Sequence, residues 1–509
     1  MLRTLLLLPL FGAVVISIFP RRWMEWMRTV ALGMTGITFI YACHLMFVHF
    51  QASVDGVQLF ESHVWRLRLG SAFALGVDGF SFPLVLLATL LTLVAVLASQ
   101  PVLIPVEYGE GEARTKGGSG RLQRNHNHTK LYYSLLLLLE TAMLGVFMAR
   151  DWLVFYLFWE LTLFPLFLLI ERMGGVNRQR AALNFVIYTM GGSVFMLVAL
   201  LLLCDATPTH SFDMVAVADS AANLPPEIQR WIFICLLIGF GVKMPLFPLH
   251  GWLPLAHVEA PSQVSILLSG ILLKMGAYGL LRTAATLPGA VADFQEMLVA
   301  LACVNVIYGA VLAWAERDLK TMVAYSSVSH MGIVLLGIAT LNKTGLTGAV
   351  VQMVAHGLTA GALFLLIGLL YERTHTRDIG DYSALAQVMP RCTFFMVFTL
   401  LAAVGLPGTA GFVAELHVLV GGFERWGGLV ALLSVGMLVS AAYALRTVGR
   451  FFTGVVSVNM ALIPDLTRSE MTAAAVLLAG ILALGIYPAP GLALIDVSVT
   501  HLSQLFSRT

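Results

Sequence analysis

The chain has 509 residues, of which 59% are hydrophobic and only 11% charged, and its mean hydropathy is +0.87. A water-soluble domain carries about 25% charged residues, so this composition excludes an ordinary soluble protein and indicates a membrane protein. The net charge of +2 gives no support for a nucleic-acid partner, and we expect none. The partner that the composition does predict is the lipid bilayer.

Apolar runs long enough to cross a bilayer follow one another along the whole chain. We count fourteen, at 1–19, 28–50, 77–100, 131–149, 151–170, 181–204, 230–249, 257–281, 294–315, 321–341, 344–371, 392–413, 420–445 and 470–490. The sequence therefore predicts an all-α polytopic membrane protein. We expect one domain over 1–509, because the only long connection, 101–130, has the glycine-rich and charged composition of a flexible polar loop.

The distribution of lysine and arginine predicts the orientation. If the N-terminus lies outside, the inner connections carry 19 of these residues, whereas the outer connections and the tails carry 9. Because inner loops are enriched in Lys and Arg, we expect a multi-pass protein of the cell inner (plasma) membrane with both termini outside.

The cysteines give no sign of a bound metal or cluster. The five of them are scattered, at Cys43, Cys204, Cys235, Cys303 and Cys392, and no two stand at ligand spacing. The sequence also lacks a glycine-rich dinucleotide loop and a P-loop. We therefore expect that the chain binds no cofactor and no metal, and that any energy source lies in other chains.

Several ionisable residues lie inside the apolar runs or, in the case of Glu415, directly after one. They are Glu160, Lys243, Lys274, His330, His356 and Glu415. A charge at mid-bilayer costs about 2.5–3.5 kcal/mol on insertion scales, and such residues commonly mark proton or ion pathways. A desolvated lysine releases its proton more readily, and a nearby carboxylate opposes that release. Glu160 and Lys243 are therefore candidates for a switchable pair, with Lys274 and His330 as the relay and Glu415 as the exit.

A purely structural interpretation stays open for some of these residues. Glu160 and Lys243 could form a buried ion pair that only fixes helix packing, and His356 could be a neutral histidine bonded to a neighbouring carbonyl. Both signs of charge, spread over six predicted spans, favour proton or ion handling over packing.

Prolines interrupt two of the predicted helices. One break contains Pro245 and Pro248 beside Lys243, and the other contains Pro407 and Gly408 near Glu415. Breaks at matched places in two halves indicate inverted repeats with sites at the breaks. We therefore expect N-terminal helices in 1–100, five-helix repeats in 131–281 and 294–445, and a last helix in 470–490.

Five stretches carry a resemblance to a known family. They are Gly76-Val-Asp-Gly-Phe-Ser-Phe-Pro83, Phe155-Tyr-Leu-Phe-Trp-Glu-Leu-Thr-Leu-Phe-Pro165, Val242-Lys-Met-Pro-Leu-Phe-Pro-Leu-His-Gly-Trp-Leu-Pro254, Tyr325-Ser-Ser-Val-Ser-His-Met-Gly332 and Tyr371-Glu-Arg-Thr-His-Thr-Arg377. With them the chain resembles the antiporter-like subunits of respiratory complex I, an NADH–quinone oxidoreductase. The resemblance implies fourteen helices in two inverted five-helix repeats, with the seventh and twelfth helices broken.

The resemblance also implies roles for individual residues. Glu160 matches the glutamate of the fifth helix, Lys243 and Lys274 match the lysines of the seventh and eighth, and His330 matches a relay position in the tenth. Glu415 matches the terminal site in the twelfth helix, where two of the three related subunit types carry lysine, and so favours the third type. The supporting candidates are His250, His356, Asp151 and Asp318.

The chain departs from the family pattern at two positions near these motifs. Leu255 stands where many members have aspartate, and Arg150 precedes Asp151, where an apolar residue is usual. Neither position belongs to the predicted proton path.

Three functions are compatible with the sequence. The first is a proton-translocating, non-redox subunit of complex I, with two further antiporter-like chains among its partners. The second is a subunit of a multisubunit cation/proton antiporter, and the third is a membrane component of an inorganic-carbon-uptake or hydrogenase complex. The residue at 415 and the match along the whole chain favour the first.

Overall fold

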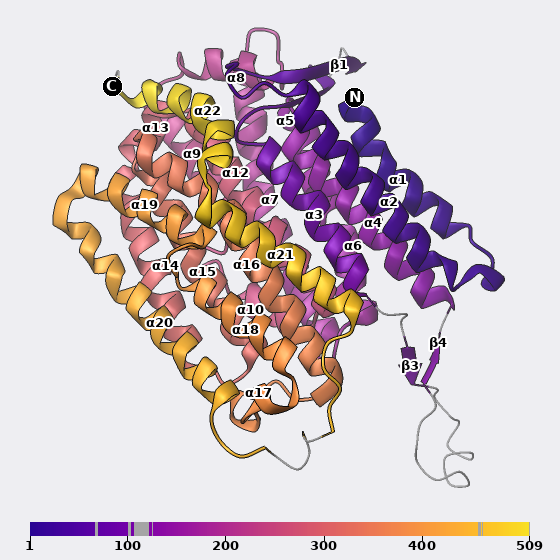
Figure 1. Ribbon diagram of the computed structural model, residues 1–509. Helices are drawn as coiled ribbons and strands as arrows, with labels where there is room; N and C mark the ends of the chain where they lie inside the picture. The colour runs from indigo at the N-terminus through magenta and orange to yellow at the C-terminus, as the bar shows by residue number, and fades with distance from the viewer. Residues whose placement is uncertain are drawn as a thin grey trace.

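The computed structural model describes residues 1–66, 70–99, 103–105, 122–124, 126–456, 460 and 462–507, and it is an elongated bundle of helices (Figure 1). Most of the predicted polar loop 101–130 lies outside these residues, except for the short strands β3 (Leu103–Pro105) and β4 (Leu122–Arg124) and the start of the next helix.

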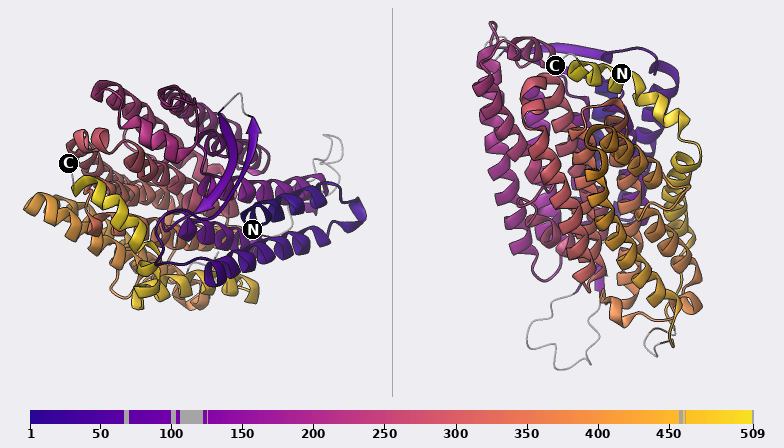
Figure 2. Two further views of the ribbon diagram at one scale, coloured as in Figure 1. Left: turned by 90° about the horizontal axis from the view of Figure 1, so that it is seen from above. Right: turned by 90° about the vertical axis from the view of Figure 1, so that its left-hand side faces the viewer.

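The N-terminal part contains helices and one β-hairpin. Its elements are α1 (Leu2–Ser17), the short turn η1 (Arg21–Trp23), α2 (Trp26–His44), the π-helical turn η2 (Leu45–His49), β1 (Gln58–Arg66), β2 (Ser71–Val77) and α3 (Phe82–Ala98). β1 and β2 pair antiparallel, and the hairpin lies across one end of the bundle (Figure 2, left).

The hairpin corrects the predicted third span. The apolar run begins at 77, but 71–77 is a strand and the helix starts only at Phe82. Asp78 sets this boundary, because its carboxylate accepts hydrogen bonds from the backbone N–H groups of Phe80 and Ser81 and turns the chain into α3.

The middle part runs from the fourth to the eighth predicted span. Its elements are α4 (His126–Met148), α5 (Trp152–Leu161), α6 (Leu163–Met173), α7 (Arg178–Ala206), α8 (Met214–Ala221), α9 (Pro226–Lys243), α10 (Trp252–Glu259), α11 (Ser262–Leu267), the π-helical turn η4 (Leu268–Leu272) and α12 (Leu273–Thr286). Residues 244–251 between α9 and α10 are not helical, so the first helix break lies where the prolines predict it.

The last part holds the second break. Its elements are α13 (Pro288–Asp293), α14 (Gln295–Ala315), α15 (Leu319–Ala339), α16 (Lys343–Thr374), η5 (Ile379–Asp381), α17 (Leu385–Val388), α18 (Pro390–Ala403), α19 (Ala410–Trp426), η6 (Gly427–Val430), α20 (Ala431–Phe452), α21 (Arg468–Ile486) and α22 (Ala489–Ser507). Residues 404–409 interrupt the chain between α18 and α19, beside Pro407 and Gly408.

Two predicted spans near the C-terminus are wrong in their limits. The run 420–445 joins the end of α19 to the start of α20, which the structure separates at Gly427, a residue with φ +58. The run 470–490 passes the end of α21 at Ile486, because Pro488 and Pro490 interrupt the helix. The 19 residues of α22 that follow were not predicted as a helix.

The predicted class, an all-α polytopic membrane protein, is confirmed. Ten helices within the described ranges are long and apolar enough to cross a membrane, and α1, α3 and α18 are shorter apolar helices. The count of fourteen spans is not confirmed. Both termini lie at the same end of the bundle, as the predicted orientation requires (Figure 1), while the side of the membrane that they face stays a prediction.

Two helices begin in the same way in the two halves. The Asp151 carboxylate caps α5 by accepting from the N–H groups of Leu153 and Val154, and Asp318 caps α15 in the same manner. Asp151 also pairs through a β-bridge with Asp213, which begins α8, and Asp318 pairs with Asp378 near α17. Because α8 and α17 lie at opposite ends of the bundle (Figure 1), these matched features agree with inverted repeats.

Helices α12, α15 and α16 form the centre of the bundle and are buried along almost their whole length. Glycines allow their close approach. A Cβ atom on Gly357 of α16 would lie 2.9 Å from the Gly270 carbonyl oxygen in η4, so main chain packs closely on main chain there. This packing brings the ionisable residues of three helices together.

Candidate functional site

Lys243 is the last residue of α9 and lies at the first helix break. Its side chain is buried, and its Nζ donates to Thr162 Oγ1 at 2.8 Å and to the Trp159 carbonyl oxygen at 3.4 Å. The ammonium also lies 4.0 Å from the centre of the Trp159 ring. Because the carbonyl end of a helix favours a cation, the proline break places Lys243 where its charge is best tolerated.

Glu160 lies close to Lys243 without touching it. The two side chains interact electrostatically, but no ion pair within 4.0 Å joins these two described residues. The Glu160 Oε1 atom is buried and has no hydrogen-bond partner in the described part of the chain. In this structure the predicted pair is therefore separated, and Thr162 takes the place of the carboxylate.

Lys274 lies two residues after the end of the π-helical turn η4. Its Nζ donates to the Ser269 carbonyl oxygen at 2.5 Å and lies 2.6 Å from His356 Nδ1. A π turn leaves main-chain carbonyls out of the regular helical pattern and is common at functional sites. Ser269 lies in that turn, so the deformation of the helix supplies an acceptor for the buried ammonium.

His356 connects Lys274 with the second half of the bundle. Its Nε2 lies 3.2 Å from Ser327 Oγ, which in turn lies 3.0 Å from Ser269 Oγ. The rings of His356 and His330 are 5.2 Å apart. The simple alternative for His356, a bond to a neighbouring carbonyl, is not what the structure shows.

Glu415 ends this series near the second break. His330 Nδ1 lies 3.5 Å from Glu415 Oε1 and 3.3 Å from Gln352 Nε2. Two small cavities of about 10 Å³ each are lined by both His330 and Glu415, and each has room for about one water molecule. Lys274, His356, His330 and Glu415 thus form a nearly continuous series of acid–base groups.

Gly405 in the second break lies directly against the Glu415 carboxylate. A Cβ atom at this position would lie 2.6 Å from Glu415 Oε2, and the backbone has φ +75. Both the space and the backbone conformation therefore require glycine.

The first and second lysines are not directly connected. No hydrogen bond between residues of the described ranges joins Lys243 with Lys274. Their helices meet at Gly276, where a Cβ atom would lie 2.8 Å from the Met244 nitrogen. A proton moving between the two lysines therefore needs water or a side-chain movement.

Sequence reasoning missed two buried cationic or basic groups near Lys274. Lys320, counted as a loop residue, is buried in the first turn of α15 and donates to the Ala260 carbonyl oxygen at 2.5 Å. His257 is fully buried, stacks on Phe364 at 4.4 Å and interacts electrostatically with both Lys320 and Lys274. His257 begins a predicted span, so the rule that selected the other residues also applies to it.

Glu140 is a third residue that sequence reasoning missed. It lies in the middle of α4, is fully buried, and neither carboxylate oxygen has a hydrogen-bond partner among the described residues. An ionised carboxylate without a partner is strongly disfavoured in such a place, so Glu140 is best accommodated as the neutral acid.

The other three supporting candidates, Asp151, Asp318 and His250, have mainly structural contacts. Asp151 and Asp318 cap helices, and Asp318 also pairs with Arg377 at 3.0 Å. His250, in the first break, packs against the rings of Phe247 and Tyr308. None of the three contacts a member of the Lys274–Glu415 series.

Arg150, one of the departures from the family pattern, belongs to a separate buried ionic cluster. It lies 3.1 Å from Asp78, which also pairs with Arg282 at 2.6 Å. The extra arginine therefore joins the start of α3 to the end of α4 and does not enter the proton-path candidates.

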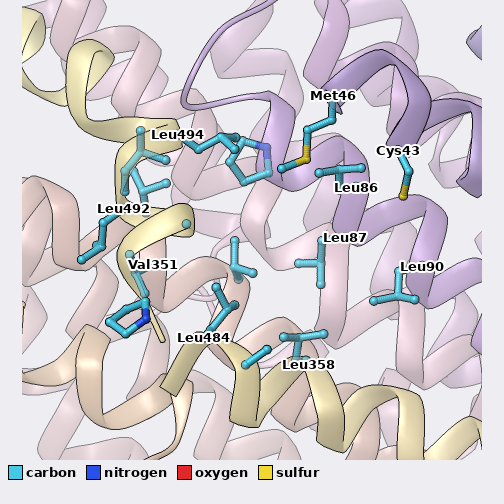
Figure 3. A pocket seen from close by; sticks show the side chains of 18 of the residues that line it. Cys43, Met46, Leu86, Leu87, Leu90, Val351, Leu358, Leu484, Leu492 and Leu494 are labelled. Atoms are coloured by element: carbon cyan, nitrogen blue, oxygen red, sulfur yellow. The ribbon is translucent and has the colours of Figure 1, made fainter. Parts of the chain in front are cut away.

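A separate apolar cavity lies elsewhere. It has a volume of about 330 Å³ between α2, α3, α16, α21 and α22, and side chains such as Leu86, Leu87 and Leu484 point into it (Figure 3). Its lining is almost wholly apolar. Within the described ranges, no group of three or more His, Cys, Asp or Glu side chains could hold a metal ion.

Comparisons with known proteins identify the family. The family described as "NADH:quinone oxidoreductase/Mrp antiporter, TM" matches residues 149–440, more than half of the chain. The chain belongs to this family. The matched range contains the whole series from Glu160 to Glu415.

Individual members of the family match the whole chain. It is 38% identical to "NAD(P)H-quinone oxidoreductase chain 4 2" of Thermosynechococcus vestitus over 99% of this chain and 92% of the relative. A chain of respiratory complex I from Thermus thermophilus has a TM-score of 0.85 and 31% identity, covering 99% of this chain and 100% of that one. The resemblance to antiporter-like subunits of complex I, and the subunit type that Glu415 favoured (chain M, the counterpart of chain 4), are confirmed.

A chain of the Mrp complex from Dietzia sp. shares the fold. Its TM-score is 0.80 at 22% identity, covering 97% of this chain and 52% of that one. At this identity the likeness shows the fold alone.

Proposed function

We propose that this chain is a proton-translocating membrane subunit of a respiratory NAD(P)H–quinone oxidoreductase, driven by quinone reduction in other subunits. The observation that carries the proposal is the series Lys274–His356–His330–Glu415, whose members come from four different helices and lie within proton-transfer contact or one water of each other. The naming of relatives as quinone oxidoreductase subunits supports the choice of complex.

The chain's own residues perform three tasks in this proposal. Lys243 moves between Thr162 and Glu160, so that the carboxylate favours the ammonium when close and lets it release its proton when distant. Lys274 receives the proton through water and passes it to His356. His356 and His330, together with Gln352 and single water molecules, carry it to Glu415. The chain holds no redox group in this scheme.

The remaining features of the proposal concern the assembly. The chain lies in the inner (plasma) membrane with both termini outside, beside two further antiporter-like chains of the same complex. The repeats occupy 131–281 and 294–445. Likeness to a chain of respiratory complex I supports the placement beside other membrane subunits.

The test is Glu160→Gln in the assembled complex. Glutamine keeps the size of the side chain but cannot change its charge, so Lys243 loses its switch. We expect quinone-coupled proton uptake into membrane vesicles to fall by about tenfold or more, with the amount of assembled complex unchanged. Normal proton uptake per electron in this variant would contradict the proposal.

A second candidate is a subunit of a multisubunit cation/proton antiporter, favoured by the family description and by the fold shared with the Mrp chain. It predicts sodium-dependent transport without quinone reduction. An inorganic-carbon-uptake or hydrogenase complex built with the same fold is distinguished by the redox subunits that copurify with the chain.

A further inference from the structure

A buried asparagine of the second half holds the first helix break. Asn305 lies on α14, is fully buried, and bonds to two main-chain groups of the break. Its Oδ1 accepts from the Phe247 N–H at 2.7 Å, and its Nδ2 donates to the Pro245 carbonyl oxygen at 3.3 Å. One amide side chain therefore satisfies both a donor and an acceptor of the segment 244–251.

The same face of α14 makes a second contact with the break. Tyr308, one turn after Asn305, packs edge-on against Phe247 at 5.3 Å and against His250 at 5.3 Å. The segment that begins directly after Lys243 is thus held by two side chains of one helix. Since a buried amide or carbonyl without a partner is costly, the position of this segment depends on Asn305.

Helix α14 is also fixed to the helix that carries His330. A Cβ atom on Gly332 would lie 2.8 Å from the Val306 nitrogen, and one on Gly309 would lie 2.6 Å from the Ser329 nitrogen, so α14 and α15 are in backbone contact. Ser329, next to His330, donates to the Val306 carbonyl oxygen at 2.8 Å. Asn305 precedes Val306 in the chain. The bonds from Asn305 to the break and from Ser329 to Val306, together with the chain neighbours Asn305–Val306 and Ser329–His330, therefore join the Lys243 break to His330.

The second break is held differently. A Cβ atom on Gly485 of α21 would lie 2.2 Å from the Gly408 carbonyl oxygen, so main chain packs on main chain there. Within the described residues, the side-chain amide that satisfies both a donor and an acceptor of a break is particular to the first one.

We infer that Asn305 is a positioning residue, which holds the 244–251 segment so that Lys243 can exchange between Thr162 and Glu160, and which links that segment to the His330 helix. This inference rests on the proposed function and adds a component from the second repeat to the site of the first.

The test uses three variants in the complete complex. Asn305→Leu keeps the size of the side chain and removes both hydrogen bonds. Asn305→Asp keeps both bonds while its carboxyl is protonated, because C=O accepts and O–H donates, and loses the donor when it ionises. Gln295→Leu is the matched control, since Gln295 is a buried amide of the same helix that donates to the Ala339 carbonyl, away from the break.

The measurements are the amount of assembled complex, the rate of quinone reduction, and proton uptake per electron from pH 5.5 to 8.5. We expect Asn305→Leu to lower proton uptake per electron by about tenfold. Asn305→Asp is expected to translocate well at low pH and progressively less as the pH rises, a profile that wild type and Gln295→Leu do not show.

Each outcome supports or overturns the role of Asn305. An Asn305→Asp profile parallel to wild type, or equal losses in Asn305→Leu and Gln295→Leu, overturns the inference. If Asn305→Leu does not assemble, the pH profile of Asn305→Asp alone decides. The proposed function is judged separately by Glu160→Gln. If proton uptake per electron is lost in Glu160→Gln but is normal in Asn305→Leu, the proposed function stands and only the role of Asn305 is wrong.

Discussion

At the scale of single residues, the sequence located the ionisable side chains but not the contacts between them. Lys274 and His330 could be selected because each interrupts an apolar run, and Glu415 because it directly follows one. The place of His356 between Lys274 and His330 depends on a histidine Nδ1 meeting a lysine from another helix at 2.6 Å. Sequence spacing within one helix carries no information about such a contact between helices.

Lys320 was assigned to a loop although it is buried. It stands two residues from Asp318 in a predicted connection, which is typical of a solvated loop. The structure buries it, because the Asp318 cap starts α15 at Leu319, two residues before the predicted span, and Lys320 donates to the Ala260 carbonyl oxygen. A cation at the border of a span can be assigned to the loop or to the core only when the helix cap is known.

His356→Leu tests the central contact of the series. Leucine fills the space but neither accepts a proton from Lys274 nor bonds to Ser327, so we expect proton uptake per electron to fall on the order of 100-fold. Proton uptake and quinone reduction are measured together in membrane vesicles.

The control for this prediction is His417→Leu. His417 lies two residues after Glu415, and its ring bonds to the Val413 carbonyl oxygen of its own helix at 2.7 Å. We expect nearly normal coupling in this variant. Equal loss in both variants would show that any histidine substitution in this region disturbs the bundle, and would remove the case for His356.

At the scale of helices, the sequence predicted the two breaks correctly but missed two other elements, the β1–β2 hairpin and helix α22. Proline removes a backbone donor whatever its surroundings, so Pro245 and Pro407 are visible in the sequence alone. The hairpin β1–β2 was hidden because the strand 71–77 is apolar and runs directly toward α3. Helix α22 was hidden because the sequence after Pro490 is less apolar than a span.

Gly405→Ala tests whether the second break positions Glu415. The new methyl group would meet the Glu415 carboxylate at 2.6 Å and would also strain a backbone with φ +75. Strain of this kind costs about 1–2 kcal/mol. We expect lower thermal stability of the complex together with a severalfold loss of proton uptake per electron.

Gly408→Ala separates the two effects. Gly408 has φ +90, but nothing lies within 4 Å of the position of its Cβ atom. It should lose similar stability and keep its coupling. Coupling lost equally in both variants would mean that backbone strain alone, and not the contact with Glu415, disturbs the break.

At the scale of the whole molecule, the sequence predicted the class and the two-fold plan, but not how the two halves share one path. The matched caps Asp151 and Asp318 give the halves the same beginning. The side chains that meet in the centre nevertheless differ, because α12 of the first half supplies Lys274 while α15, α16 and α19 of the second supply its partners. An internal repeat predicts equivalent backbones and leaves the side chains free to diverge.

The side chains of the Lys274–Glu415 series determine which ion the chain can carry. Its members are nitrogen bases and one carboxylate, whereas a sodium site needs several oxygen ligands around one point. We therefore expect translocation coupled to quinone reduction to be unchanged, within about twofold, when sodium is replaced by potassium at fixed pH. A strict sodium requirement would favour the antiporter function.

The two cavities beside Glu415, each of about 10 Å³, also bear on losses across an energised membrane. A membrane potential of 100 mV favours the return of each translocated proton by about 2.3 kcal/mol. An unbroken column of water would let protons flow back without being coupled to quinone reduction. Room for about one water in each of these two cavities is too little for such a column. The tight packing around Glu415 and Gly405 therefore limits proton leakage. Protons can pass only when a side chain moves, so the membrane potential is preserved during the intervals in which no side chain moves.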